Sequence, residues 1–168
     1  MIVENGTGKA DANSFTSVAF ADLYFSARNR AEWALLSTDA KQAALILATD
    51  YIEATYSQGW KGQKATAAQA LSWPRAYVVI DDFDVSATHI PPVLMNAVCE
   101  LALRASARPL IEDQGQRVVK EKIDVIETQY ADASDPQKRY PLVTRMLAPL
   151  TQSVMDGGGF QTVRVVRT

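Results

Sequence analysis

The sequence predicts a mainly α fold: a small bundle of about four helices with a short β-hairpin or strand segment and an extended C-terminal tail. Two long stretches repeat apolar side chains at helical spacing, and Ser, Thr or Pro stands where these helices would begin. A β-prone run follows three glycines near the end. We divide the chain into an N-terminal extension (1–13), a helical domain (14–156), and a flexible linker with a C-terminal tail (157–168).

The N-terminal third is expected to be helical in three places. A first helix occupies about 14–29, and a turn or short helix covers 32–35. The clearest helix begins at Ser37 or Thr38 and stops before Ser57. Its inward face is predicted to contain Ala44, Leu47, Ala48, Tyr51, Ile52 and Thr55.

The middle of the chain alternates short elements with a second long helix. A short helix is expected near 66–71, with Pro74 ending it, and a strand over residues 77–80. One of the prolines at 91–92 begins the long helix and Pro109 marks its end. Its inward face is predicted to contain Leu94, Ala97, Val98, Leu101, Ala102 and Ala105. The expected core joins the two long helices to Trp73 through Leu47, Tyr51, Ile52, Leu94, Val98 and Leu101.

The C-terminal third combines a strand, a helix and a tail. Residues 119–128 alternate as a strand does, but both faces carry charge, which favours a solvated strand or one paired with another subunit. A last helix begins at Tyr140-Pro141 with Val143, Met146, Leu147 and Leu150 inward. Three glycines at 157–159 then act as a linker.

Composition excludes several classes of protein. The 168 residues suit one domain, and 48% apolar residues exclude disorder throughout. The net charge of −2 and the pI near 5.4 fit neither a DNA mimic nor a strong phosphate binder. A single cysteine fits a reducing compartment. We expect no membrane span and no signal peptide, and therefore a protein that stays in the cytoplasm or in an assembly built there.

Two motifs partly resemble ligand-binding loops, one for phosphate and one for calcium, but their residue spacing does not fit either loop. Residues 6–10, Gly-Thr-Gly-Lys-Ala, lack the first glycine and the final hydroxyl of a phosphate loop, so we expect a mobile turn. Asp81, Asp82 and Asp84 would need Gly and Glu at later positions to form a calcium loop, and a solvated loop is expected instead.

Candidate catalytic groups are few. His89 is the only histidine and no serine or cysteine motif accompanies it. Cys99 lies next to the apolar face of a helix, as small core residues do. We predict that the protein is not an enzyme and has no catalytic, cofactor or metal-binding residues.

One cluster admits two interpretations. Basic and aromatic side chains alternate in this cluster, as they do in proteins that bind single-stranded nucleic acid. The cluster consists of Trp60, Lys61, Lys64, Trp73 and Arg75. The alternative is a packed structural corner formed by Trp73, Pro74 and Arg75. We favour the corner because only three positive charges are present and an alanine-rich stretch separates the tryptophans.

The order of motifs resembles a family widespread in tailed phages and prophages, often labelled DnaT-like single-stranded-DNA-binding protein. The resemblance covers roughly residues 2–150. The motifs are Val3–Gly8 with Ala10–Ser14, Ala21–Phe25, Ala48–Ile52, Gln69–Arg75, Ile90-Pro91 before Glu100–Ala102, and Tyr140-Pro141.

The resemblance implies a structural role in the head–tail connector. Members resemble helical adaptor subunits that form a ring, usually of twelve copies, beneath the portal protein. Such a ring extends the DNA channel and receives a stopper or tail-terminator protein, so DNA passes through without specific binding. The implied location is the virion, at the head–tail junction, after assembly in the bacterial cytoplasm. The alternative is a single-stranded-DNA-binding replication accessory protein.

The tail is the predicted contact with the portal. We expect strand addition onto the portal, with residues 157–159 as the hinge. The docking residues would be Phe160, Val163, Arg164, Val165, Val166 and Arg167. A disordered terminus is the alternative for this segment.

Overall fold

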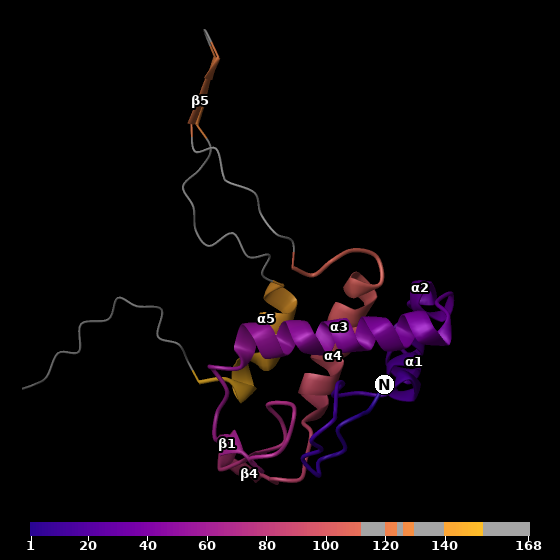
Figure 1. Cartoon of the computed structure of the whole chain (residues 1–168), viewed down its shortest axis with the longest axis vertical. Coiled ribbons are helices and arrows are strands. Elements are labelled where there is room, and N and C mark those ends of the chain that lie inside the picture. Colours follow the sequence, from indigo (N-terminus) through magenta and orange to yellow (C-terminus); the bar gives the residue numbers. More distant parts are fainter. Residues whose placement is uncertain (112–119, 124–125, 130–139, 153–168) are drawn as a thin grey trace, which may run out of the picture.

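A computed structural model describes residues 1–111, 120–123, 126–129 and 140–152 (Figure 1). Helices dominate, and short strands complete the fold, as the sequence predicts. The predicted linker and tail lie outside the described residues.

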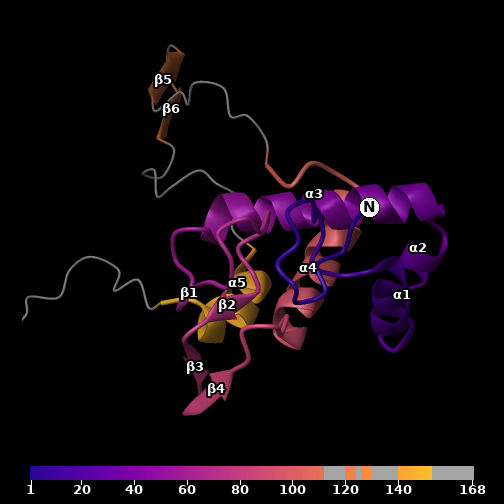
Figure 2. The ribbon, with the colours of Figure 1, turned by 60° about the horizontal axis from the view of Figure 1, so that its bottom comes forward.

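Five α-helices and one 3-10 helix occur in the described chain. They are α1 (Val18–Ser26), α2 (Ala31–Ala34), α3 (Thr38–Tyr56), α4 (Pro92–Ala105), α5 (Pro141–Leu147) and η1 (Ala148–Leu150). Ser17 and Ser37 cap α1 and α3 by accepting backbone N–H groups, and Pro92 begins α4. Helix α3 crosses α4 and α5 and forms the long side of the domain (Figure 2).

The strands form three antiparallel pairs. They are β1 (Gln63–Lys64) with β2 (Arg75–Ala76), β3 (Val78–Ile80) with β4 (Phe83–Val85), and β5 (Lys120–Ile123) with β6 (Ile126–Gln129). The strand predicted at 77–80 is confirmed as β3. Within the alternating run predicted at 119–128, the described residues form two antiparallel strands, β5 and β6, rather than one strand.

The short helix predicted near 66–71 does not form. The Gln69 side chain organises a loop there by donating to the carbonyls of Leu71 and Pro74, at 2.8 and 3.0 Å. Its oxygen accepts the backbone N–H of Thr66 at 2.9 Å. A buried side-chain amide therefore replaces the hydrogen bonds that a helical turn would make.

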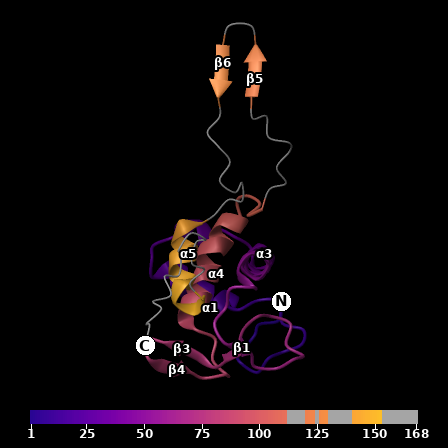
Figure 3. The same ribbon diagram turned by 90° about the vertical axis from the view of Figure 1, so that its left-hand side faces the viewer.

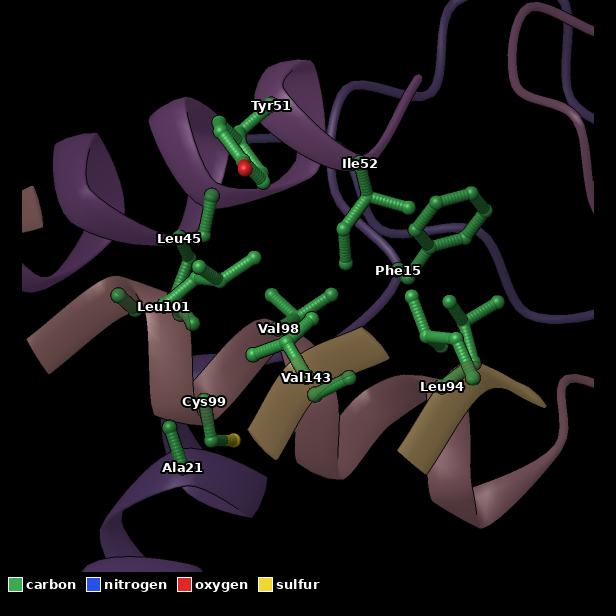
Figure 4. Packing of buried hydrophobic residues seen from close by; sticks show 14 of the residues in the cluster. Phe15, Ala21, Leu45, Tyr51, Ile52, Leu94, Val98, Cys99, Leu101 and Val143 are labelled. Carbon is green, nitrogen blue, oxygen red and sulfur yellow. The ribbon is translucent and has the colours of Figure 1, made fainter. Parts of the chain in front are cut away.

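The core lies between α3, α4 and α5, and the loop before α1 adds Phe15 (Figure 4). The prediction that Leu47 faces this core is wrong: Leu47 is 53% exposed, and Leu45 is fully buried instead. Thr55 is also exposed. Leu45 has helical spacing with Ala48 and Ile52, whereas Leu47 has it with Ala44 and Tyr51. Only the packing of α4 on α3 therefore decides which leucine is covered.

We expect Leu101→Ala to lower the free energy of unfolding by about 2–5 kcal/mol, because Leu101 is fully buried between α3 and α4. Urea unfolding measures this. Leu35→Ala is the matched control, since Leu35 is 87% exposed and should change stability by less than about 0.5 kcal/mol. Equal midpoints for the two variants would contradict the core assignment.

Candidate functional site

The Trp73-Pro74-Arg75 segment forms a buried corner. Trp73 is fully buried, its bond to Pro74 is cis, and its ring meets Trp60 edge to face at 6.0 Å. The Arg75 guanidinium donates to the carbonyls of Lys61, Gly62 and Ser72 at 2.6, 2.7 and 3.2 Å. Burial lowers the pKa of Arg75, and the nearby Glu53 carboxylate partly offsets this shift. This arginine joins two stretches of backbone.

Glu53 attaches the same corner to α3. Its carboxylate accepts the backbone N–H and the hydroxyl of Ser72, at 3.0 and 2.6 Å. The carboxylate therefore fixes the loop before Trp73 to the C-terminal end of α3.

Most of the predicted cluster of basic and aromatic side chains is buried in this corner, so only its exposed members can contact a nucleic acid. Trp60, Trp73 and Arg75 are buried and cannot stack on bases. Lys64 is exposed and Lys61 is partly exposed. Only the two lysines of the predicted cluster remain for a ligand.

The glycine-rich segment at residues 6–9 surrounds an internal carboxylate. Glu4 is 2% exposed and accepts the backbone N–H groups of Gly6, Gly8 and Lys9 at 2.8, 3.0 and 2.7 Å. The Lys9 ammonium donates to the carbonyl of Val3 at 2.8 Å. Such a nest of N–H groups binds anions, and here the anion is the protein's own side chain.

The remaining motif residues show no catalytic arrangement. His89 is exposed, and Cys99 is fully buried, as the sequence predicts for a core cysteine. Burial, followed by the Glu100 carboxylate, raises the pKa of the Cys99 thiol to about 12. Within residues 1–111, 120–123, 126–129 and 140–152, no three His, Cys, Asp or Glu side chains gather as a metal site would require.

Exposed apolar side chains occur on both faces of the β3–β4 hairpin. We call this hairpin the β3–β4 tip: Tyr77 precedes β3, Val79 pairs with Asp84 on one face, and Phe83 lies on the other face next to the Asp81-Asp82 turn. Tyr77 is 82%, Phe83 77% and Val79 46% exposed. These exposed side chains were not predicted, although Tyr77 and Phe83 stand close to three aspartates in the sequence, which indicates a surface position.

A second apolar surface lies where the end of α4 faces α3. We call it the α3–α4 groove, a depression of about 640 Å³ lined by Leu47, Asp50, Ala54, Arg108, Leu110 and Ile111 among others. Leu47 and Ile111 are about half exposed. Partial burial raises the pKa of Asp50. The leucine wrongly assigned to the core is thus part of this groove.

The predicted docking residues, Phe160 to Arg167, lie outside the described residues. No helix in the described chain is long and apolar enough to cross a membrane.

Comparison with known proteins gives one match. The model of the family described as "Putative DnaT-like ssDNA binding protein" matches residues 1–168. No curated protein and no solved structure matches the chain. The match spans the whole printed sequence and is not restricted to the Trp-Pro-Arg motif.

Proposed function

The chain belongs to the DnaT-like ssDNA binding family, and within that family we propose that it is a structural subunit of a tailed-phage head–tail connector. Copies form a ring, of twelve subunits by resemblance, beneath the portal. The ring extends the DNA channel and receives a stopper or tail-terminator protein. It acts without catalysis, is assembled in the host cytoplasm and stays in the virion.

One observation carries this proposal: several large exposed apolar side chains of the described chain lie on two separate surfaces, the β3–β4 tip and the α3–α4 groove. The β3–β4 tip and the α3–α4 groove both expose apolar side chains, while the tryptophans and Arg75 serve the fold. Exposed apolar patches mark interaction sites. A subunit between neighbours needs more than one such surface.

A second candidate is ssDNA binding in replication, and the family description supports it more directly than it supports the connector. Lys61 and Lys64 flank Gly62, whose backbone lies close to the carbonyl groups of Ala76 and Tyr77. The backbone of the exposed Tyr77 therefore lies near the segment that carries the two lysines, and single-strand binders combine aromatic and basic side chains. The three aspartates of the β3–β4 tip weaken this surface for phosphates.

Portal binding tests the connector. Heads that carry the portal but lack this protein are mixed with the purified chain, separated by sedimentation and imaged. We expect the full chain to join the portal vertex, and a variant ending at Asp156 to stay folded but not to join, because the tail supplies the contact. A full chain that never joins would exclude the connector. A truncated chain that joins would exclude only tail docking.

A labelled oligo-dT titration separates the second candidate. The connector predicts affinity no tighter than roughly micromolar at physiological salt, as for non-specific contacts. Nanomolar binding that Lys61→Glu and Lys64→Glu abolish, while Arg108→Glu leaves it unchanged, would support ssDNA binding instead.

A further inference from the structure

We propose that the β3–β4 tip of one copy seats in the α3–α4 groove of a second copy. This inference rests on the proposed ring and assigns the surfaces through which neighbouring subunits meet. The contact joins two different surfaces, so repeated copies would form a closed ring or an open filament, depending on the rotation between them.

Three non-glycine residues of the β3–β4 tip adopt a backbone conformation that L-amino acids rarely take. Tyr77, Asp81 and Asp82 have φ values of 60°, 49° and 66°, in the left-handed region. Asn-Gly is the preferred pair for a two-residue turn of this kind. The chain places two aspartates there, with Asp84 next to them, and a bulky aromatic residue at the strained position before β3. Strain of this kind clusters where structure serves binding.

The charge of the tip favours a protein partner. Asp81, Asp82 and Asp84 are exposed and take part in no ion pair within the described chain. The three carboxylates stand on both sides of Phe83 in the sequence, in the turn and in β4, and they repel a phosphate backbone. They suit a recess that accepts aromatic rings and has a cation at its rim.

The α3–α4 groove provides that combination. Leu47, Leu110 and Ile111 make it largely apolar, Asp50 adds one carboxylate, and its volume of about 640 Å³ accommodates aromatic side chains. Arg108 lies on its wall, is exposed, and has no ion-pair partner among the described residues. Its guanidinium is the expected partner of the tip carboxylates.

The occupant must come from another copy because the two surfaces lie at opposite ends of α4. The chain enters α4 from the β3–β4 side (Figure 3). The groove is built by residues at and beyond the last turn of α4, together with residues of α3. Fourteen helical residues span about 21 Å. The tip of a molecule cannot reach its own groove.

Cross-linking between two single-cysteine variants tests the contact. Affinity-tagged Phe83→Cys is mixed with untagged Leu47→Cys and treated with a short bis-maleimide. The buried Cys99 should not react, and mass spectrometry of the treated wild-type chain verifies this. We expect a tagged–untagged cross-link in the mixture and little cross-linking of either variant alone. Leu35→Cys replaces Leu47→Cys as the matched control, since Leu35 is more exposed, precedes the start of α3 and does not line the groove.

A charge exchange gives the second readout. Asp84→Lys added to the tip variant, or Arg108→Glu added to the groove variant, should reduce the cross-link several-fold. Mixing the two altered chains should restore it, because the pair is then reversed rather than broken. Cross-linking that is absent, or equal with Leu35→Cys, overturns the assignment.

Failure of the interface is distinguishable from failure of the connector. Rings imaged on portals without the Phe83–Leu47 cross-link would mean that subunits meet through other surfaces. Absence of any addition to portals would exclude the connector itself. If Phe83→Ser and Tyr77→Ser weaken oligo-dT binding while no cross-link forms, the aromatic rings contact bases and the proposed interface is wrong.

Discussion

Replacing Arg75 with alanine is expected to lower the free energy of unfolding by about 3–5 kcal/mol. The change leaves three backbone carbonyls, those of Lys61, Gly62 and Ser72, without their buried donor. It also removes the cation next to Glu53. Urea unfolding followed by tryptophan fluorescence measures the loss, because Trp60 and Trp73 lie in the same corner.

Two controls separate geometry from charge. Arg75→Lys keeps the charge but not the planar fork, so it should recover only part of the stability. Arg108→Ala removes an exposed arginine and should change stability by less than about 0.5 kcal/mol. If Arg75→Ala left stability unchanged but weakened oligo-dT binding, Arg75 would be a nucleic-acid contact rather than a structural residue.

The helix ends could be predicted from the sequence because their signals are local. Ser17, Ser37 and Pro92 act within one turn of the helices they begin, and the structure places them there. The helix predicted near 66–71 does not form because the interactions that shape this segment are not local. Its alanines favour a helix, but Gln69 bonds to carbonyls up to five residues away in a buried loop. Helix propensities describe local preferences and do not account for these side-chain hydrogen bonds.

The choice between Leu45 and Leu47 shows a second limit. Either leucine completes an acceptable apolar face on α3, and the sequence does not say which face α4 covers. Only the structure reveals that Leu47 is left at the surface, where it becomes part of the α3–α4 groove. The α3–α4 groove therefore could not be predicted from the sequence.

The family could be reached from the sequence, but its role could not. The motifs from Val3 to Tyr140 carried the resemblance, and the family match covers the whole chain. The description of that family favours the ssDNA alternative, whereas the connector depends on the resemblance and on exposed surfaces. Portal and oligo-dT binding distinguish them because one requires the tail and the other requires the two lysines.

Replacing the buried Glu4 is the second substitution for which we expect a large loss of stability. We expect Glu4→Gln to lower the free energy of unfolding by about 2–4 kcal/mol, because charge-assisted bonds to three backbone N–H groups are lost or weakened. The amide has only one acceptor oxygen, and its NH₂ group would face an N–H donor. Thr7→Ala is the matched control, since Thr7 is exposed and bonds only to Asn5, so it should change little.

Gly6→Ala tests the same segment from the backbone side. Gly6 has φ +97°, and an added Cβ would lie 1.9 Å from the Thr88 carbonyl oxygen, so the segment must shift away from the domain. We expect a loss of stability at least as large as that of Glu4→Gln, with amide exchange accelerated first at Gly8 and Lys9. Wild-type exchange and midpoint should not respond to ATP, because the carboxylate of Glu4 already fills the nest. Protection of Gly8 and Lys9 by ATP in the wild-type chain would instead mean that the segment binds phosphate and that Glu4 leaves it.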